Sequence, residues 1–332
     1  GLAARGLGGY TIDGRPIYGA IDPTAAGCDA TLVDASSVTW EGVTAPCFRT
    51  SRDDEIMLTN SGGYSSQIAS FILSRRSQGG LFTSGGAVDF SFGYAFTDSH
   101  DRRNMYNSTA TSNYDYLAAF DRQNPDVSRG FYGSKHNISV NTSFKEEFFA
   151  DLATRLNVSF VASSGRPYSL TFTGGGVFND SAAGNDNALL YIPAGLNDAN
   201  IAPTSNADAV AALYEFTQGL GCAKKYAGRT IARNTCENDW YFDVDLSLSQ
   251  ELPGPGRLFG RDDKFKVYAM FDNFLNFVDK DWNISRRRQF AGFQDMASLS
   301  GIDSEGRYII SAFNTGAFDT DNEIKTTASV WR

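Results

Sequence analysis

The sequence has no run of about 18 or more consecutive apolar residues, so it contains no candidate transmembrane helix. It has only two histidines, His100 and His136, and neither lies in a spacing typical of a metal site or a Ser/His/Asp triad. Acidic residues outnumber basic ones, 38 to 29, and no basic stripe is present, so we expect no nucleic-acid partner. We therefore predict no enzymatic activity, no catalytic residue, no metal and no cofactor.

Cysteine is also scarce, and its placement is informative. The four cysteines form two local pairs, Cys28 with Cys47 and Cys222 with Cys236, each within one predicted loop. Local pairs in surface loops are typical of disulfides made in an oxidising compartment. We predict both as structural disulfides, with four free thiols as the alternative.

Alternation of apolar and polar residues is the feature that the sequence has in abundance. A strand points successive side chains to opposite faces, so an alternating run has one apolar and one polar face. The clearest run places Trp240, Phe242, Val244, Leu246 and Leu248 on one face and Tyr241, Asp243, Asp245, Ser247 and Ser249 on the other. Such a run predicts a strand that separates two different environments.

Eight segments are predicted as strands. They cover about 7–18, 64–76, 81–97, 131–144, 151–164, 239–250, 264–277 and the residues from 324 onward. The first is interrupted by Gly8, Gly9 and Gly14, and the last is truncated. Most are longer than the usual strand of a globular protein, which has about five or six residues. Short turns alternate with long connections (21–53, 98–130, 169–237 and 279–323), and within 169–237 the segment 206–219 has modest helical character.

Long alternating strands with all their long connections at one end are typical of an antiparallel transmembrane β-barrel with long extracellular loops. We therefore expect about eight strands of a larger barrel, with the apolar face toward lipid and the polar face toward a lumen. The charged residues expected to face that lumen are Arg155, Asp243, Asp245, Lys266 and Asp272. A soluble β-sandwich also alternates and remains the alternative fold.

Several stretches between about 160 and 285 recur in an order and spacing known from one protein family. They are Ser164-Gly165-Arg166-Pro167-Tyr168, Leu189-Leu190-Tyr191-Ile192-Pro193, Asp243-Val244-Asp245-Leu246, Ser249-Gln250-Glu251-Leu252-Pro253 and Phe271-Asp272-Asn273-Phe274-Leu275-Asn276. In these stretches the chain resembles the C-terminal barrel of TonB-dependent outer-membrane receptors, most like the Oar-like group.

The resemblance implies a location in the outer membrane of a Gram-negative bacterium and a barrel of about 22 strands with a plug inside. The implied partners are outer-membrane lipid, the protein's own N-terminal plug, the TonB energy-transducing complex through that plug, and an imported solute. The solute classes are iron chelates, glycans, peptides and vitamins, and no ligand-binding residue follows from the sequence.

The chain corresponds to the last third of such a barrel. We therefore expect residues 1–332 to be the C-terminal part of a longer polypeptide, without plug and final strand. Two other functions remain open: an outer-membrane structural or adhesion barrel without transport, and a soluble secreted β-sandwich binding protein.

Overall fold

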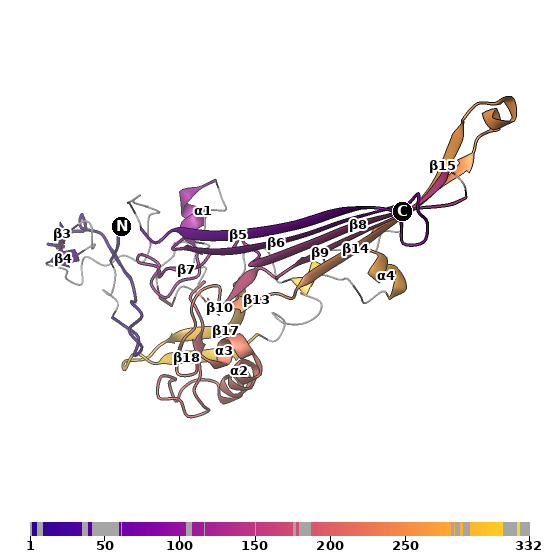
Figure 1. Ribbon diagram of the computed structural model, residues 1–332. Helices are drawn as coiled ribbons and strands as arrows, with labels where there is room; N and C mark the ends of the chain where they lie inside the picture. The colour runs from indigo at the N-terminus through magenta and orange to yellow at the C-terminus, as the bar shows by residue number, and fades with distance from the viewer. Residues whose placement is uncertain are drawn as a thin grey trace.

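The largest element of the computed structural model is a long antiparallel sheet (Figure 1). The described residues are 2–4, 9–34, 39–41, 60, 62–103, 108–115, 117–149, 151–174, 177–178, 187–279, 282, 286–287, 293–314 and 324–325. Among them, seven strands form this long sheet in the order β15-β14-β9-β8-β6-β5, with β7 paired to β6. They are β5 (Ser65–Gln78), β6 (Ala87–Asp101), β7 (Ser128–Arg129), β8 (His136–Phe149), β9 (Leu152–Ser163), β14 (Tyr241–Pro253) and β15 (Lys264–Phe271).

Five of these strands have 12 to 15 residues, as the alternating pattern predicts. The predicted strands near 64–76, 131–144, 151–164 and 239–250 are confirmed as β5, β8, β9 and β14. Short turns join β5 to β6, β8 to β9 and β14 to β15, whereas long connections join β6 to β8 and β9 to β14. In an antiparallel sheet this alternation sends both long connections out from the same end of the strands.

The connection from β9 to β14 folds together with a later segment into a second unit, which we call the globular module (164–174, 187–237 and 293–314). Its sheet has the order β13-β10-β17-β18, and β10 pairs with β17 in parallel, unlike the antiparallel pairing predicted throughout. Its elements are β10 (Pro167–Gly174), β11 (Tyr191–Ile192), α2 (Ala207–Gly219), α3 (Gly221–Lys224), β12 (Arg229–Thr230), β13 (Cys236–Glu237), β17 (Phe293–Ile302) and β18 (Tyr308–Phe313). In Figure 1 this module lies below the long strands.

Helix α2 is the helix that the segment 206–219 predicts. Asn206 begins it, because the Asn206 side chain accepts hydrogen bonds from the backbone N–H groups of Asp208 and Ala209. Its buried face includes Val210 and Leu213, which join the module core.

The remaining elements are short and lie outside both sheets. They are β1 (Leu2–Ala4), β2 (Gly19–Ile21), β3 (Thr31–Asp34), β4 (Thr39–Glu41), α1 (Ala110–Asp115), the 3₁₀ helix η2 (Pro255–Phe259), α4 (Phe274–Val278), β16 (Arg286–Arg287) and β19 (Ile324–Lys325). None of the described helices is long and apolar enough to cross a membrane.

The hydrophobic core belongs to the globular module. Its fully buried side chains include Leu170, Phe172, Leu190, Leu213 and Tyr308. Among the described residues, every member of this core cluster lies outside the seven strands of the long sheet. Within the described part of the chain, the long sheet therefore has no second layer of its own, in contrast to the packed core that a β-sandwich requires.

The described residues form seven strands of the long sheet, where about eight are expected. The predicted first strand, 7–18, forms no strand over its described residues 9–18, because Gly9 and Gly14 adopt positive φ angles of 97° and 88° and the chain turns there. In the predicted last strand, the described residues 324–325 form β19, which pairs with β16 and not with the long sheet.

Two other predicted strands have different boundaries. The predicted strand 81–97 begins at Ala87 as β6 and continues to Asp101, because a turn occupies residues 79–86. The predicted strand 264–277 ends at Phe271, because Asn273 adopts a positive φ of 55° and donates its backbone N–H to the Asp245 carboxylate at 2.9 Å. Helix α4 follows that bend directly.

Candidate functional site

The strand register assigns the residues of the long sheet to two faces, because residues paired across antiparallel strands point to the same side. One row across the strands consists of Leu73, Phe92, Val140, Phe160 and Val244. The adjacent row, on the opposite face, consists of Ser74, Ser91, Asn141, Ser159 and Asp245. We call these sides the apolar face and the polar face.

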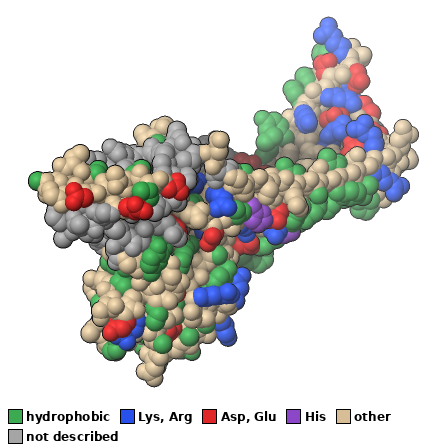
Figure 2. Space-filling view, turned by 90° about the vertical axis from the view of Figure 1, so that its left-hand side faces the viewer, with side chains coloured by type: hydrophobic (Ala, Val, Ile, Leu, Met, Phe, Trp, Pro, Cys, Tyr) green, Lys and Arg blue, Asp and Glu red, His purple; other side chains and the backbone are tan. Residues whose placement is uncertain are grey.

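The apolar face is open. Leu73 is 51% exposed and Phe242 is 44% exposed, although both are large hydrophobic side chains. Phe160 and Leu246 are half-buried, and neither belongs to the hydrophobic core cluster. Figure 2 shows hydrophobic side chains gathered along one side of the extended sheet. A soluble protein rarely exposes so large a contiguous apolar surface unless something covers it.

The five charged residues predicted to face a lumen share the polar side of the sheet. Arg155, Asp243 and Asp245 pair with Ser249, Val161 and Ser159, which belong to the polar rows. Lys266 pairs with Glu251 on the same side, and Asp272 follows directly after β15. Whether this side faces a lumen remains a prediction.

A groove of about 570 Å³ lies on the polar face, and Asp245 and Asp272 are the two predicted residues that line it. The other polar-row side chains lining it are Ser74, Arg76, Asp89, Ser91, Asn141, Ser143, Asn157, Ser159, Ser247 and Met270. The volume falls in the roughly 300–1,000 Å³ range of ligand pockets. A groove across several strands indicates that the polar face is concave.

The charges of this groove lie at its two ends, with Arg75, Arg76 and Asp89 at the β5–β6 end. Arg76 of β5 donates to the Asp89 carboxylate of β6 at 2.7 Å. At the other end, the Asp245 carboxylate accepts a hydrogen bond from the Asn273 backbone N–H. Asp272, the residue before Asn273, also lines this end of the groove. The central strands β8 and β9 contribute only neutral polar-row side chains, so the middle of the groove consists of hydroxyl and amide groups.

Aromatic residues form a belt on the apolar face at the end where the long connections leave. The His136 ring stacks on Trp240, with ring centroids 5.9 Å apart and 12° between the planes. Trp240 stacks in turn on Phe242, and Phe96 contacts the other side of His136 at 5.5 Å. Tyr94 shares a 2.9 Å hydrogen bond with the His136 Nδ1. Amphipathic aromatic rings at strand ends are typical of a membrane–water interface.

The opposite rim, at the short turns, also exposes large hydrophobic side chains. Leu258 and Phe259 of η2 are 86% and 84% exposed, and Phe82 of the β5–β6 turn is similarly open. That turn is held by Glu146 of β8, whose carboxylate accepts the backbone N–H groups of residues 81–83. The short turns thus have a fixed backbone and apolar side chains directed outward.

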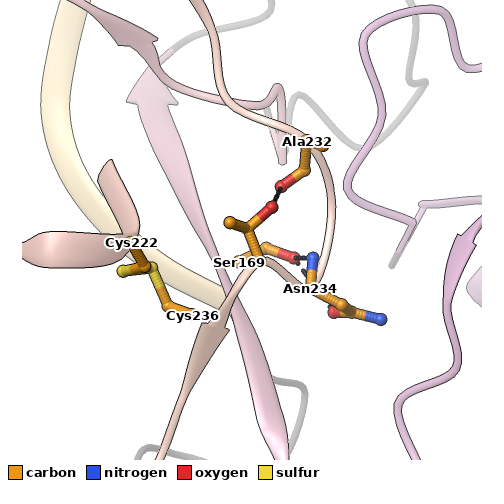
Figure 3. Close-up of a disulfide and its surroundings, with 6 residues drawn as sticks. Ser169, Cys222, Ala232, Asn234 and Cys236 are labelled. Atoms are coloured by element: carbon orange, nitrogen blue, oxygen red, sulfur yellow. Dashed lines mark hydrogen bonds between the residues drawn. A yellow bond between two sulfur atoms is a disulfide. The ribbon is translucent and has the colours of Figure 1, made fainter. Parts of the chain in front are cut away.

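The globular module is attached to the rim of the long sheet through Arg233 and Asn234. Figure 3 shows Asn234 and Ser169 together with the Cys222–Cys236 disulfide. The Arg233 guanidinium donates to the Asp101 carboxylate at 2.6 Å. Asn234 has a positive φ of 57°, and its backbone N–H donates a hydrogen bond to the Ser169 hydroxyl at 2.8 Å. The Asn234 side-chain amide donates to the Arg129 carbonyl of β7 at 2.7 Å. The contact therefore fixes the module against β6 and β7.

The predicted disulfide between Cys222 and Cys236 is confirmed, and it links α3 to β13 beside this contact. Cys28 is also disulfide-bonded, and its predicted partner Cys47 lies outside the described residues. A bridge with a sequence separation of 14 restricts the unfolded chain.

We expect the double variant Cys222→Ser/Cys236→Ser to lower the unfolding free energy of the globular module by about 3 kcal/mol, because a loop of this length loses that much closure entropy. The measurement is thermal unfolding in detergent with and without reductant. Reductant should shift the transition of the native chain by more than that of the double variant, in which only the Cys28 disulfide can still be reduced. An equal shift in both would contradict the structural role of this bridge.

A polar cluster is buried at the edge of the module core. The Arg15 guanidinium lies 4.6 Å from the Phe178 ring centroid and donates to the Leu189 carbonyl. Tyr308 donates to the Asp13 carboxylate at 2.8 Å, and burial together with that carboxylate raises the pKa of Tyr308 to about 12. Tyr308 is therefore a neutral hydrogen-bond donor at physiological pH.

The globular module is not predicted from the sequence, in which residues 169–237 are interpreted as a loop with one short helix. The apolar run Leu189-Leu190-Tyr191-Ile192 and the disulfide next to it are the signals that indicate a packed unit. Within the part of the chain that is described, no group of three or more His, Cys, Asp or Glu side chains is arranged to hold a metal ion.

In comparisons with known proteins, no protein-family model, no curated protein sequence and no solved structure matches this chain. The open apolar face, the concave polar face and the two rims are therefore the observations from which a function can be proposed.

Proposed function

We propose that this chain forms the C-terminal part of the barrel wall of an outer-membrane receptor of the TonB-dependent type, most like the Oar-like group. The apolar face contacts lipid, the polar face lines the lumen, and the globular module lies outside the cell. In such a receptor a plug binds the energy-transducing complex, and further strands close the barrel. The function is gated, energised import of a solute.

The single observation that best supports this proposal is the pair of unlike faces on a sheet that no second sheet of described residues covers. Lipid stabilises an exposed apolar face, whereas water does not. Strands of 12 to 15 residues exceed the roughly 9–11 residues that a tilted strand needs to cross the hydrocarbon core. The soluble β-sandwich is disfavoured, because within the described residues no second sheet covers Leu73 or Phe242.

Both edges of the long sheet support the idea that this is one piece of a wall. On the outer sides of β5 and β15, the described residues contribute no further strand to the long sheet. Unpaired backbone groups are costly in lipid, so both edges need neighbouring strands to close a barrel. The remainder of a larger barrel would supply them.

The aromatic belt and the short-turn rim support the orientation of the wall. The belt at His136 and Trp240 matches one membrane interface, and the exposed Leu258 and Phe259 match the other. Outer-membrane barrels have short turns on the periplasmic side and long connections outside. This orientation makes the module extracellular and η2 periplasmic.

Cysteine labelling of whole cells tests this orientation. Leu196 of the module is 62% exposed and Leu258 of η2 is 86% exposed, so both positions accept a cysteine without loss of packing. We expect a membrane-impermeant maleimide to label Leu196→Cys on intact cells and Leu258→Cys only after the outer membrane is permeabilised. Native chain, whose described cysteines are all in disulfides, is the control for background labelling.

Labelling of Leu258→Cys on intact cells would contradict the orientation. Recovery of both variants as water-soluble protein, without membrane association, would contradict the membrane location itself.

An adhesion barrel without transport is the second candidate, and the globular module is the observation that favours it. A packed, disulfide-linked unit at the long-connection end offers a rigid surface for a partner outside the cell. The two functions differ in energy coupling. Solute uptake that disappears when the energy-transducing complex is deleted supports the receptor, whereas cell attachment that is unaffected by that deletion supports adhesion.

A further inference from the structure

The groove on the polar face offers a particular hydrogen-bonding surface. Its central part is made of the Asn141 and Asn157 amides and the hydroxyls of Ser143 and Ser159, from the neighbouring strands β8 and β9. The register pairs Ser143 with Asn157 and Asn141 with Ser159, so each amide has a hydroxyl beside it on the adjacent strand. The four side chains therefore form a compact, alternating patch of amides and hydroxyls.

These groups recognise one kind of chemistry better than others. A hydroxyl and a primary amide each donate and accept hydrogen bonds. The ligand groups that match such a surface also donate and accept hydrogen bonds, as the hydroxyl groups of alcohols do. Ser91 and Ser247 extend the same chemistry to the strands on either side. The Cβ atoms of the serines and the Met270 side chain supply the non-polar surface that the C–H groups of a sugar ring contact.

The charges that line the groove argue against an anionic ligand. Two cations line the groove, Arg75 and Arg76. Arg76 pairs with Asp89 at 2.7 Å, and Arg75 pairs in register with Phe90, which belongs to the apolar face. The three carboxylates of the lining outnumber these cations, and two of them, Asp245 and Asp272, lie at the β14–β15 end. A carboxylate repels phosphates and acidic chelates, but it accepts hydrogen bonds from two neighbouring hydroxyls of a sugar.

We propose that this groove binds a neutral, polyhydroxylated solute, that is, an oligosaccharide, with its middle on the Asn141–Asn157 patch and one end at Asp245 and Asp272. This inference rests on the proposed function, because it assigns the substrate class of the lumen-facing side. The groove, with a volume of about 570 Å³, accommodates a short segment of an oligosaccharide and not a large globular partner.

The test measures binding by calorimetry, with the full chain in detergent. The probes are three neutral hexasaccharides (maltohexaose, cellohexaose and xylohexaose), ferric citrate as an anionic chelate, and tetralysine as a basic peptide. We expect at least one neutral hexasaccharide to bind more tightly than ferric citrate and tetralysine. The absence of binding by all three sugars, or tighter binding of either charged probe, would overturn the proposal.

Matched variants locate the site on the polar face. Asn141→Ala and Asn157→Ala remove amides inside the groove, and each should weaken sugar binding by about tenfold. Asn137→Ala removes an amide from the same face of β8 outside the groove lining, and it should leave sugar binding unchanged. Equal losses at residues 137 and 141 would place the sugar elsewhere and overturn the assignment.

The outcomes separate this inference from the proposed function. A chain that shows the expected cysteine labelling on cells but binds no neutral sugar keeps the membrane orientation and loses the substrate class. A chain that fails the labelling test loses the proposed function, whatever it binds in detergent.

Discussion

Leu246→Arg is expected to block assembly of the long sheet into the outer membrane, whereas Ser247→Arg is expected to have a much smaller effect. Leu246 lies near the middle of β14 on the apolar face, in register with Val158 and Phe271. A charged side chain facing lipid near the bilayer midplane costs roughly 2–4 kcal/mol. Ser247 is the next residue of the same strand, and its side chain points to the polar face with Asn157.

The measurement is the fraction of each variant recovered folded in the outer membrane, by heat-modifiable migration and by extraction. The pair is matched in strand, depth and introduced residue, so the difference depends only on the face. A second apolar-face variant, Phe242→Arg, should behave like Leu246→Arg but more mildly, because the aromatic belt lies nearer the interface. Equal losses at residues 246 and 247 would contradict the assignment of the faces.

Leu213→Ala is expected to destabilise the globular module by about 2–5 kcal/mol, the range for removing a fully buried leucine. Leu213 is 0% exposed on the buried face of α2 and packs into the core cluster with Val210. The control is Leu196→Ala, because Leu196 is 62% exposed and its truncation leaves no cavity. Denaturant unfolding of the chain in detergent, followed by the near-ultraviolet signal of the module tyrosines, measures the difference.

The same variant tests whether the two units are separate in their stability. Among the described residues, the core cluster contains no side chain from the long sheet, so Leu213→Ala should leave membrane assembly of that sheet unchanged. Loss of assembly together with loss of module stability would contradict two independent units. Wild-type unfolding behaviour of Leu213→Ala would contradict the packing of α2 onto β18.

The alternating residues account for what could be predicted. Period-two patterns are local, so Phe242, Val244 and Leu246 indicate both the strand and its apolar face without knowledge of a partner. The helical spacing of Val210 and Leu213 similarly predicts α2. The Cys222–Cys236 pair is predicted because the two residues are close along the chain.

The wrong predictions of strand ends and strand pairing arise where the backbone conformation of a single residue, or pairing between distant segments, determines the structure. Asn273 ends β15 through a left-handed conformation and a hydrogen bond to Asp245, 28 residues away. No local sequence pattern predicts this strand end. The segment around Gly9 and Gly14 alternates weakly but turns, because glycine permits positive φ. The parallel pairing of β10 with β17 joins residues more than 120 positions apart, and only packing selects it.

The sequence by itself determined that this protein is a β-protein built from long two-faced strands, because side-chain alternation is a property of each strand alone. It also determined the local disulfide and the charged residues of the polar face. The tertiary structure decided that the long connection folds into a module with its own core, and that Asn141, Asn157 and Asp245 line one groove. Those outcomes depend on register and curvature, which arise only when strands distant in the chain pair and pack.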